Sequence, residues 1–205
     1  MNIGIIGAGN IGKTAADLFA RAGHQVALSN SRGPETLQGT AAELGPNVTA
    51  MTARDAAAFG EVVLEAVPFG NYRELPADSL AGKVLISASN YYPERDGEID
   101  FHGLTQTGLV AEHLGGARVV KAFNTIFWKH LHEQGDTGLP LSERRAIFVA
   151  GDDAEAKRVV TGLIEALGFA VLDTGKLKES AVQEPGSSVY AKDLTLSEAE
   201  AMLER

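Results

Sequence analysis

The residues with the clearest chemical potential stand near the start of the chain. A Gly-x-Gly-x-x-Gly string follows the apolar run at residues 3–6, and its members are Gly7, Gly9 and Gly12. The first glycine allows a tight strand-to-helix turn, the second lets the backbone approach a pyrophosphate, and the third lets helix and strand pack closely. The string therefore predicts a dinucleotide-binding turn.

A second cluster indicates which dinucleotide would bind. It consists of Ser29, Asn30, Ser31 and Arg32, and Arg32 stands 20 residues after Gly12. Sites specific for NAD usually place an acidic residue here for the ribose hydroxyls, and that carboxylate would repel a 2′-phosphate. No acid occurs between Asp17 and Glu35. Hydroxyls, an amide and a guanidinium suit phosphate instead, so we predict NADP(H). The alternative is a polar loop with a solvated Arg32.

Alternating strand-like and helix-like segments would position these groups. Apolar residues at helical spacing predict a helix that begins at Asn10 and ends before Gly23, and its free N-terminal N–H groups make Asn10 and Ile11 candidate pyrophosphate contacts. Strands are expected at residues 3–6, 24–28, 47–51, 62–67, 83–87 and 118–122, and helices at 35–44, 52–60 and 106–114. This order predicts an α/β fold with a Rossmann-type doubly wound parallel sheet.

The last third of the chain has a different pattern. We expect a helix at residues 126–132, strands at 145–150 and 169–172, a helix at 152–167, a loop at 175–190 and a terminal helix at 197–205. Residues 1–125 are thus predicted to form an NADP-binding Rossmann domain. Residues 126–205 are predicted to form a small C-terminal α/β lobe that packs on it and is not independent.

Composition excludes several classes of function. The 205 residues carry a net charge of −9 with no basic stripe, so nucleic acid is not an expected partner. The absence of cysteine excludes disulfides and thiol nucleophiles. His130 and His132 point to different sides of a helix, so no metal site is expected. No apolar stretch reaches the length of about 18 residues that a membrane span needs, and no leader is recognisable. We expect a cytoplasmic protein without membrane association.

Loops at the ends of the predicted strands carry further candidates, because ligands of open parallel sheets bind outside the carboxyl ends of the strands. The apolar edge of Val67 and Pro68 would lie along the ribose or nicotinamide, and Asn90 or Asn124 would hydrogen-bond the carboxamide. Each has a plain structural alternative: Pro68 as a strand terminator, and the two asparagines as turn residues.

No catalytic side chain is assigned from the sequence. Hydride transfer needs mainly alignment and exclusion of water, so an acid or base is not obligatory. Tyr91 and Tyr92 are candidates for stacking on a flavin-like ring, with simple packing as the alternative. His130 or His132 would either touch an acceptor or be solvated at the surface.

Six strings together resemble the NADP-dependent oxidoreductases related to the reductase of the deazaflavin coenzyme F420. They lie at residues 7–12, 29–35, 66–70, 89–93, 120–125 and 150–153. The resemblance implies direct hydride exchange between NADPH and a small-molecule acceptor, either a deazaflavin, a flavin or another compound, held in a cleft beside the nicotinamide. It also suggests a homodimer, with an acidic monomer as the alternative.

Two other functions stay open. One is an NADP-binding, redox-sensing module without turnover. The other is an imine or hydroxy-acid reductase of small substrates, although such enzymes commonly append a larger helical domain. A cavity formed by the C-terminal lobe against Phe69, Tyr91 and Phe123 would favour the enzyme, and a closed or absent cavity would favour the binding module.

Overall fold

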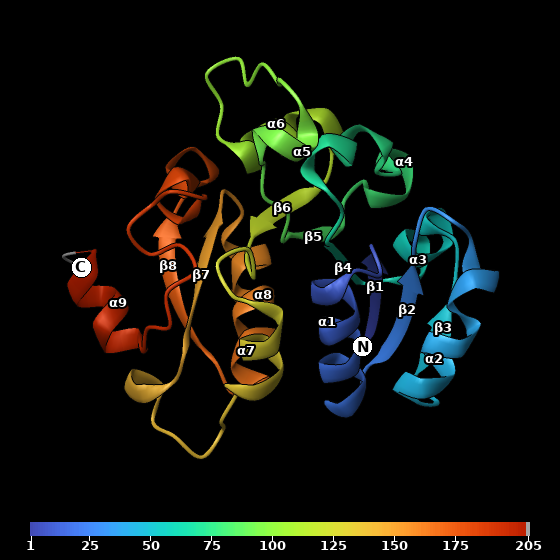
Figure 1. The fold of residues 1–205 in the computed structure, drawn as a ribbon, viewed down its shortest axis with the longest axis horizontal. Coiled ribbons are helices and arrows are strands. Elements are labelled where there is room, and N and C mark those ends of the chain that lie inside the picture. Colours follow the sequence, from blue (N-terminus) through green and yellow to red (C-terminus); the bar gives the residue numbers. More distant parts are fainter. Residues whose placement is uncertain (204–205) are drawn as a thin grey trace.

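The structure is a computed structural model that describes residues 1–203. These residues form one eight-stranded sheet with the strand order β3-β2-β1-β4-β5-β6-β7-β8. The strands are β1 (Asn2–Ile6), β2 (Gln25–Ser29), β3 (Val48–Ala50), β4 (Val62–Glu65), β5 (Val84–Ser87), β6 (Arg118–Lys121), β7 (Ala146–Gly151) and β8 (Ala170–Gly175). Figure 1 shows β2 and β3 near one end of the molecule and β7 and β8 near the other. The predicted α/β, Rossmann-type architecture is confirmed.

The sheet is parallel except at one junction. Strands β1 to β6 pair in parallel, and β7 pairs with β8 in parallel. However, β7 runs antiparallel to β6, with Val120 opposite Gly151 and Lys121 opposite Ala150. The predicted parallel sheet is thus confirmed except at this junction, where the connection at residues 122–145 reverses the chain instead of returning it through a crossover. Direct pairing of β6 and β7 carries the sheet past residue 125, and the division into residues 1–125 and 126–205 stays a prediction.

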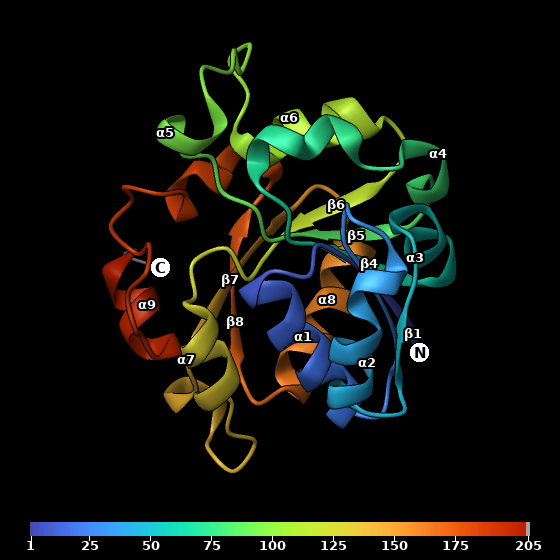
Figure 2. The same ribbon diagram turned by 45° about the vertical axis from the view of Figure 1, so that its right-hand side comes forward.

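The helices cover the two faces of the sheet. They are α1 (Asn10–Arg21), α2 (Gln38–Leu44), α3 (Ala53–Phe59), α4 (Ala77–Leu80), α5 (Pro93–Asp96), α6 (Gln106–Leu114), α7 (Trp128–Glu133), α8 (Ala154–Ala166) and α9 (Leu196–Met202). Figures 1 and 2 place α4 and α6 on one side of the sheet and α1, α7 and α8 on the other. Within residues 1–203, every helix falls short of the length and apolar character needed to traverse a bilayer.

Two layers of apolar side chains hold this arrangement together. The larger layer packs Ile5 and Leu64 against Phe19 of α1 and Val160 of α8. The other packs the opposite face of the strands against α6 and includes Leu85. Because successive strand residues point to opposite faces, a strand buried on both sides reads as a continuous apolar run. This explains why the apolar runs predicted the central strands correctly.

Short elements were missed in the sequence. They are α4, α5 and the 3-10 helices η2 (Phe69–Glu74), η3 (Leu141–Glu143) and η4 (Leu177–Gln183), whereas the predicted helix at residues 35–44 is divided into the 3-10 helix η1 (Pro34–Leu37) and α2. The predicted loop at residues 175–190 therefore contains a helical turn. The predicted terminal helix corresponds to α9, and residues 204–205 of that prediction lie outside the described part of the chain.

Candidate functional site

The turn between β1 and α1 has the geometry of a phosphate-binding loop. Gly7 adopts a φ of +109°, and a Cβ there would lie 2.5 Å from the carbonyl oxygen of Ala66. A Cβ on Gly12 would lie 1.8 Å from the carbonyl oxygen of Gly7, whereas a Cβ on Gly9 would have nothing within 4 Å. Gly7 and Gly12 therefore let strand and helix close on each other, and Gly9 leaves open the space through which a phosphate reaches the backbone. These residues fit a dinucleotide.

The N-terminus of α1 is free to receive an anion. Gly9 is its N-cap and provides no side-chain hydrogen bond, and the first turn contains no acidic residue. By contrast, Thr52, Thr105 and Asp153 accept hydrogen bonds from the N-terminal amides of α3, α6 and α8. Uncapped N–H groups and the helix dipole both favour a bound phosphate. Asn10 and Ile11, predicted as pyrophosphate contacts, line the second cavity described below and not the one that contains Arg32.

The second predicted cluster lies in the same cavity as the glycine turn. Asn30, Ser31 and Arg32 line a cavity of about 360 Å³ together with Gly7 and Gly9. The side-chain oxygen of Asn30 accepts a hydrogen bond from the Arg32 amide at 3.0 Å, which fixes the loop. Arg32 is exposed, and within residues 1–203 no hydrogen bond or ion pair engages its guanidinium group. A guanidinium without a protein partner suits a 2′-phosphate.

Two details of this cavity differ from expectation. Ser29 was predicted as a phosphate contact, but it is completely buried and its hydroxyl donates to the Ile5 carbonyl oxygen at 2.8 Å. The sheet thus uses its donor, and Ser29 is not brought to the cavity. An acid is present as well, since Glu74 of η2 lines the cavity with Asn71. Glu74 follows Arg32 by more than 40 residues in sequence, so the local lack of acids did not reveal it.

A second cavity of about 390 Å³ adjoins the first one. Both cavities are lined by Gly9, Ala66, Val67 and Pro68. The second is also lined by Phe123, which is buried and adopts a φ of +61°. This conformation is unusual for a bulky side chain and occurs preferentially at functional sites. The predicted residues Val67 and Pro68 therefore form the boundary between two compartments.

The two predicted asparagines, Asn90 and Asn124, contact each other in the second cavity. The Asn124 side-chain nitrogen donates to Asn90 Oδ1 at 3.0 Å and to the Gln183 carbonyl oxygen at 2.6 Å. Asn90 Nδ2 donates to the Asn124 carbonyl oxygen at 2.8 Å. Asn124 Oδ1 is buried without a hydrogen-bond partner among the described residues. Asn124 Oδ1 is therefore the acceptor of this pair that has no partner, whereas both ends of the Asn90 amide are engaged, and a contact of either residue with a carboxamide stays a prediction.

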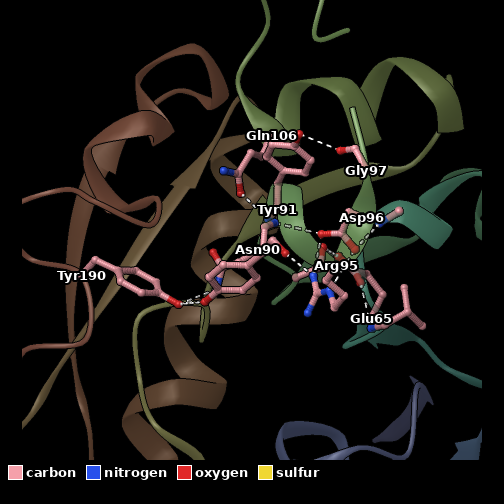
Figure 3. A network of polar contacts seen from close by, with 12 residues as sticks. Glu65, Asn90, Tyr91, Arg95, Asp96, Gly97, Gln106 and Tyr190 are labelled. Carbon is pink, nitrogen blue, oxygen red and sulfur yellow. Dashed lines mark hydrogen bonds and ion pairs between the residues drawn. The ribbon is translucent and has the colours of Figure 1, made fainter. Parts of the chain in front are cut away.

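The aromatic residues of the second cavity are only partly those expected. Tyr91 packs against Phe69 and Phe101, and its hydroxyl donates to the Gly97 carbonyl oxygen at 2.8 Å. Tyr91 and Phe69 therefore do not line the cavity, which contradicts their predicted role beside an acceptor. Tyr92 does line it, and so do three aromatic residues from the last third of the chain, namely Phe127, Trp128 and Tyr190. Figure 3 shows Tyr190 pointing toward Asn90, whereas the Tyr91 ring points toward Gly97.

Two buried charged residues lie behind this cavity and were missed in the sequence. Glu65 at the end of β4 accepts hydrogen bonds from the hydroxyls of Ser87 at 2.5 Å and Ser89 at 2.8 Å. Burial raises the pKa of the Glu65 carboxyl, and these hydrogen bonds offset only part of that shift. Lys121 on β6 donates to Thr107 Oγ1 at 2.9 Å. Burial lowers the pKa of Lys121 to about 8.

The register of the sheet explains why these groups are neighbours. Glu65 pairs with Ser87, and Ser87 pairs with Lys121, so all three lie in one row across β4, β5 and β6. Glu65 connects the loops at the ends of β4 and β5, because its other oxygen accepts from the Val67 amide at 3.4 Å. A charged residue inside an apolar strand was the signal available in the sequence, since burial of such a residue requires partners.

The histidines stand apart from this network. His130 Nδ1 lies 2.8 Å from Asp193 Oδ1, and His132 Nδ1 lies 3.6 Å from Asp17 Oδ2. Each histidine thus faces a different acidic residue, as expected for side chains on two sides of a helix. Within residues 1–203, no group of three or more side chains is arranged to hold a metal ion.

Comparison with known proteins agrees with this geometry. The family profile described as coenzyme F420-dependent NADP oxidoreductase matches residues 2–91. A hypothetical protein from Sinorhizobium meliloti has a similar structure, with a TM-score of 0.83, 34% sequence identity and 95% of each chain covered. A structure from Arthrobacter sp. FB24, described as a candidate F420-dependent NADP reductase, has a TM-score of 0.72 and 27% identity, and covers 87% of this chain and 86% of its own.

A third relative is a much longer protein. The metalloreductase STEAP3 of Rattus norvegicus is 32% identical over 178 residues, which is 85% of this chain and 34% of that protein. The chain thus spans about a third of the length of this relative. The family description names NADP(H) as the nucleotide. The glycine turn and the free Arg32 guanidinium, which line one cavity, are consistent with that nucleotide. Residues 2–91 of the chain thus belong to the family of F420-dependent NADP oxidoreductases.

Proposed function

We propose that this chain transfers a hydride between NADP(H) and a deazaflavin, a flavin or another small planar acceptor. The main support for this proposal is that the two cavities adjoin and have four lining residues in common, namely Gly9, Ala66, Val67 and Pro68. A donor in one cavity and an acceptor in the other would meet where the two cavities adjoin, beside these residues. Direct hydride transfer requires such contact, because the reacting atoms must approach to about 3 to 3.5 Å.

The first cavity would hold the nucleotide. The open space beside Gly9 and the uncapped N-terminus of α1 suit the pyrophosphate, and Arg32 with Ser31 suits the 2′-phosphate. The apolar edge of Val67 and Pro68 would then orient the nicotinamide end. When bound, NADPH supplies the hydride.

The second cavity has the composition expected for a planar acceptor. Phe127 and Trp128 offer ring faces or edges to the space that Val67 and Pro68 also line, and Phe127 is 50% exposed. Aromatic walls bind conjugated rings by stacking and exclude water from the reacting atoms. The family is described as dependent on coenzyme F420, which is a deazaflavin, and this supports a deazaflavin as the class of acceptor. The larger STEAP3 protein is described as a metalloreductase, and this chain spans about a third of its length.

Oxidation of NADPH tests the proposal. It is followed at about 340 nm, the nicotinamide band, against 5-deazariboflavin, flavin mononucleotide, menadione and 2-methyl-1-pyrroline. We expect turnover with one of the conjugated ring acceptors, and faster turnover with NADPH than with NADH. Turnover with the imine alone would favour the small-substrate reductase. Tight NADPH binding without turnover of any of the four would favour the redox-sensing module.

A further inference from the structure

Two tyrosine hydroxyls meet on the wall of the second cavity. Tyr92 precedes α5, and Tyr190 follows η4, 98 residues later in the chain. Both side chains line the cavity, and their hydroxyl groups are hydrogen-bonded to each other. Figure 3 shows Tyr190 reaching this contact from the C-terminal segment. The loop after β5 and the C-terminal segment therefore place a hydrogen-bonded pair of hydroxyl groups on the wall of the second cavity.

The asparagine pair fixes the direction of the hydrogen bonds that lead to this contact. Asn124 Nδ2 donates to Asn90 Oδ1, which orients the Asn90 amide. Asn90 Nδ2 then donates to the Asn124 carbonyl oxygen and, at 3.3 Å, to the Tyr190 hydroxyl oxygen. Because an amide nitrogen can only donate, Tyr190 must accept here. Accepting this bond polarises the Tyr190 hydroxyl and favours its donation to Tyr92.

A count of hydrogens leaves one of them unused. Two phenols carry two hydroxyl hydrogens, and the contact between Tyr92 and Tyr190 uses one of them. Within residues 1–203, neither hydroxyl has another acceptor at hydrogen-bond distance. With Tyr190 donating to Tyr92, the remaining hydrogen belongs to Tyr92. It is available to an occupant of the cavity that Tyr92 lines.

A fixed positive charge lies against the same ring. The Arg95 guanidinium carbon is 5.1 Å from the centroid of Tyr92. Arg95 donates to Asp96 at 2.9 and 2.8 Å and to the Asn90 carbonyl oxygen at 2.6 Å. The Asp96 side chain is only 1% exposed and also accepts from the Tyr92 amide at 2.9 Å. A guanidinium held in this way stabilises negative charge on the Tyr92 oxygen.

We propose that Tyr92 is a catalytic proton donor to the acceptor, with Tyr190 and Arg95 as positioning residues. The proposal rests on the proposed function. In the reduction of a deazaflavin-type ring, the hydride forms a new C–H bond at the electrophilic carbon, and the ring π electrons move to a conjugated nitrogen. That nitrogen takes the hydrogen of the Tyr92 hydroxyl as the O–H bond breaks, and water returns a proton to Tyr92. The sum is NADPH, acceptor and one proton in, and NADP⁺ and dihydro-acceptor out.

The state of Tyr190 is consistent with this role. Burial, together with its hydrogen bond to Tyr92, raises the pKa of Tyr190 above its ordinary value. Tyr190 therefore stays a neutral hydroxyl that can donate to Tyr92 near neutral pH. Its donation, together with the Arg95 charge, stabilises the Tyr92 oxygen once the proton has left.

Three tyrosine variants of the full chain test the proposal. Tyr92→Phe removes the donor and keeps the ring, and Tyr190→Phe removes the hydroxyl that orients it. Tyr91→Phe is the matched control, because the Tyr91 hydroxyl donates to Gly97 away from the cavity. Hydride transfer is measured in single turnovers by stopped flow, in H₂O and D₂O. The probe is 5-deazariboflavin or, where the wild type does not reduce it, whichever of the other three acceptors it does reduce.

We expect Tyr92→Phe to slow hydride transfer about 100-fold, a typical contribution of a general acid. Tyr190→Phe should slow it about 10-fold, because Tyr92 loses its orienting partner. Tyr91→Phe should stay within about 2-fold of the wild type. The wild type should show a solvent isotope effect on this step, and Tyr92→Phe should not. A fluorescence titration of 5-deazariboflavin should give a dissociation constant about 5-fold higher for Tyr92→Phe, since one hydrogen bond is lost.

The outcomes separate the two proposals. If the wild type reduces an acceptor and Tyr92→Phe reacts as fast as Tyr91→Phe, the proton-donor role is overturned and the proposed function stands. If the wild type binds NADPH and reduces none of the acceptors, the proposed function fails, and the proton donor fails with it. Thermal melting establishes that each variant is folded. If Tyr92→Phe is not folded, the rate and isotope effect of Tyr190→Phe decide in its place.

Discussion

The two compartments on either side of Val67 and Pro68 are built in different ways. In the first cavity, which we propose holds the nucleotide and call the nucleotide compartment, the groups suited to phosphate have little contact with other side chains, as the exposed Arg32 guanidinium and the uncapped N-terminus of α1 show. In the second cavity, which we propose holds the acceptor and call the acceptor compartment, polar groups are hydrogen-bonded to each other, and Asn90, Tyr92 and Tyr190 belong to one network. One compartment has free donors, whereas the other has a prearranged network.

The difference follows from the charge of the expected ligands. A phosphate supplies strong acceptors, so donors that await it are satisfied on binding and are solvated before it. A neutral conjugated ring supplies few polar atoms, so polar groups around it must satisfy one another or remain costly. The arrangement predicts that substitutions in the nucleotide compartment change affinity with little effect on stability. In the acceptor compartment, they change stability and rate together.

The largest contrast is expected between two glycines of one turn. Gly9→Ala should lower NADPH affinity at least about 100-fold, because a methyl group would occupy the approach of the pyrophosphate and cost several charge-assisted hydrogen bonds. Its thermal stability should be unchanged, since a Cβ there has nothing within 4 Å. Gly12→Ala should lower the free energy of unfolding by about 3 kcal/mol, because its Cβ would lie 1.8 Å from the Gly7 carbonyl oxygen. Calorimetric titration and chemical denaturation of both variants measure this contrast, and equal loss of affinity and stability in the two would contradict it.

The next effect concerns the choice of nucleotide. Arg32→Ala should raise the dissociation constant of NADPH about 10- to 100-fold and leave that of NADH unchanged, because the guanidinium would meet only the 2′-phosphate. Arg54→Ala is the matched control, since Arg54 lines a neighbouring cavity and not the one that contains Arg32. Titration with both nucleotides is the measurement. An equal loss of affinity for NADPH and NADH in Arg32→Ala would mean that Arg32 does not bind the 2′-phosphate.

The sequence predicted more of the nucleotide compartment than of the acceptor compartment. Gly7 to Gly12 and Asn30 to Arg32 are short contiguous strings whose geometry follows from one turn and one strand end. Their positions were predicted, except that Ser29 is used inside the sheet. The contact between Tyr92 and Tyr190 joins residues 98 positions apart. No local pattern encodes it, because it depends on where the C-terminal segment returns.

The fold shows the same limit. Apolar runs predicted β1, β4 and β5, since strands buried on both faces leave a continuous apolar signature. The antiparallel pairing of β6 and β7 was not predicted, because strand direction depends on the path of the connecting chain and not on the strand residues. Glu65 and Lys121 were missed as partners of one row, since their adjacency depends on the register of three strands.

A third prediction concerns the charged residue behind the acceptor compartment. Burial lowers the pKa of Lys121 from its ordinary 10.5 to about 8. Between these values the unfolded chain binds a proton that the folded chain does not, so the free energy of unfolding rises with pH. Lys121→Met removes this dependence. Between about pH 7 and about pH 9.5, the free energy of unfolding of the wild type, measured by urea denaturation, should rise by about 2 kcal/mol more than that of Lys121→Met. A constant difference across this range would mean that Lys121 is charged and solvated in the folded protein.

The smallest effects give the most direct comparison of the two compartments. Ser31→Ala should change the free energy of unfolding by less than about 0.5 kcal/mol, because the exposed Ser31 hydroxyl has no hydrogen bond among the described residues. Asn90→Ala should lower it by about 1 to 2 kcal/mol, because the side-chain nitrogen of Asn124 loses one of its two acceptors and Tyr190 loses a donor.

A double-mutant cycle measures how strongly two side chains of the acceptor compartment depend on each other. Asn90→Ala and Tyr190→Phe should be coupled by about 0.5 to 1 kcal/mol in the free energy of unfolding, because one hydrogen bond joins the two side chains. Asn90→Ala and Ser31→Ala, one from each compartment, should be additive. Coupling of the second pair would show that the wall of Val67 and Pro68 transmits strain between the compartments. The two sites would then be one cooperative unit, and nucleotide binding would itself alter the network around Tyr92.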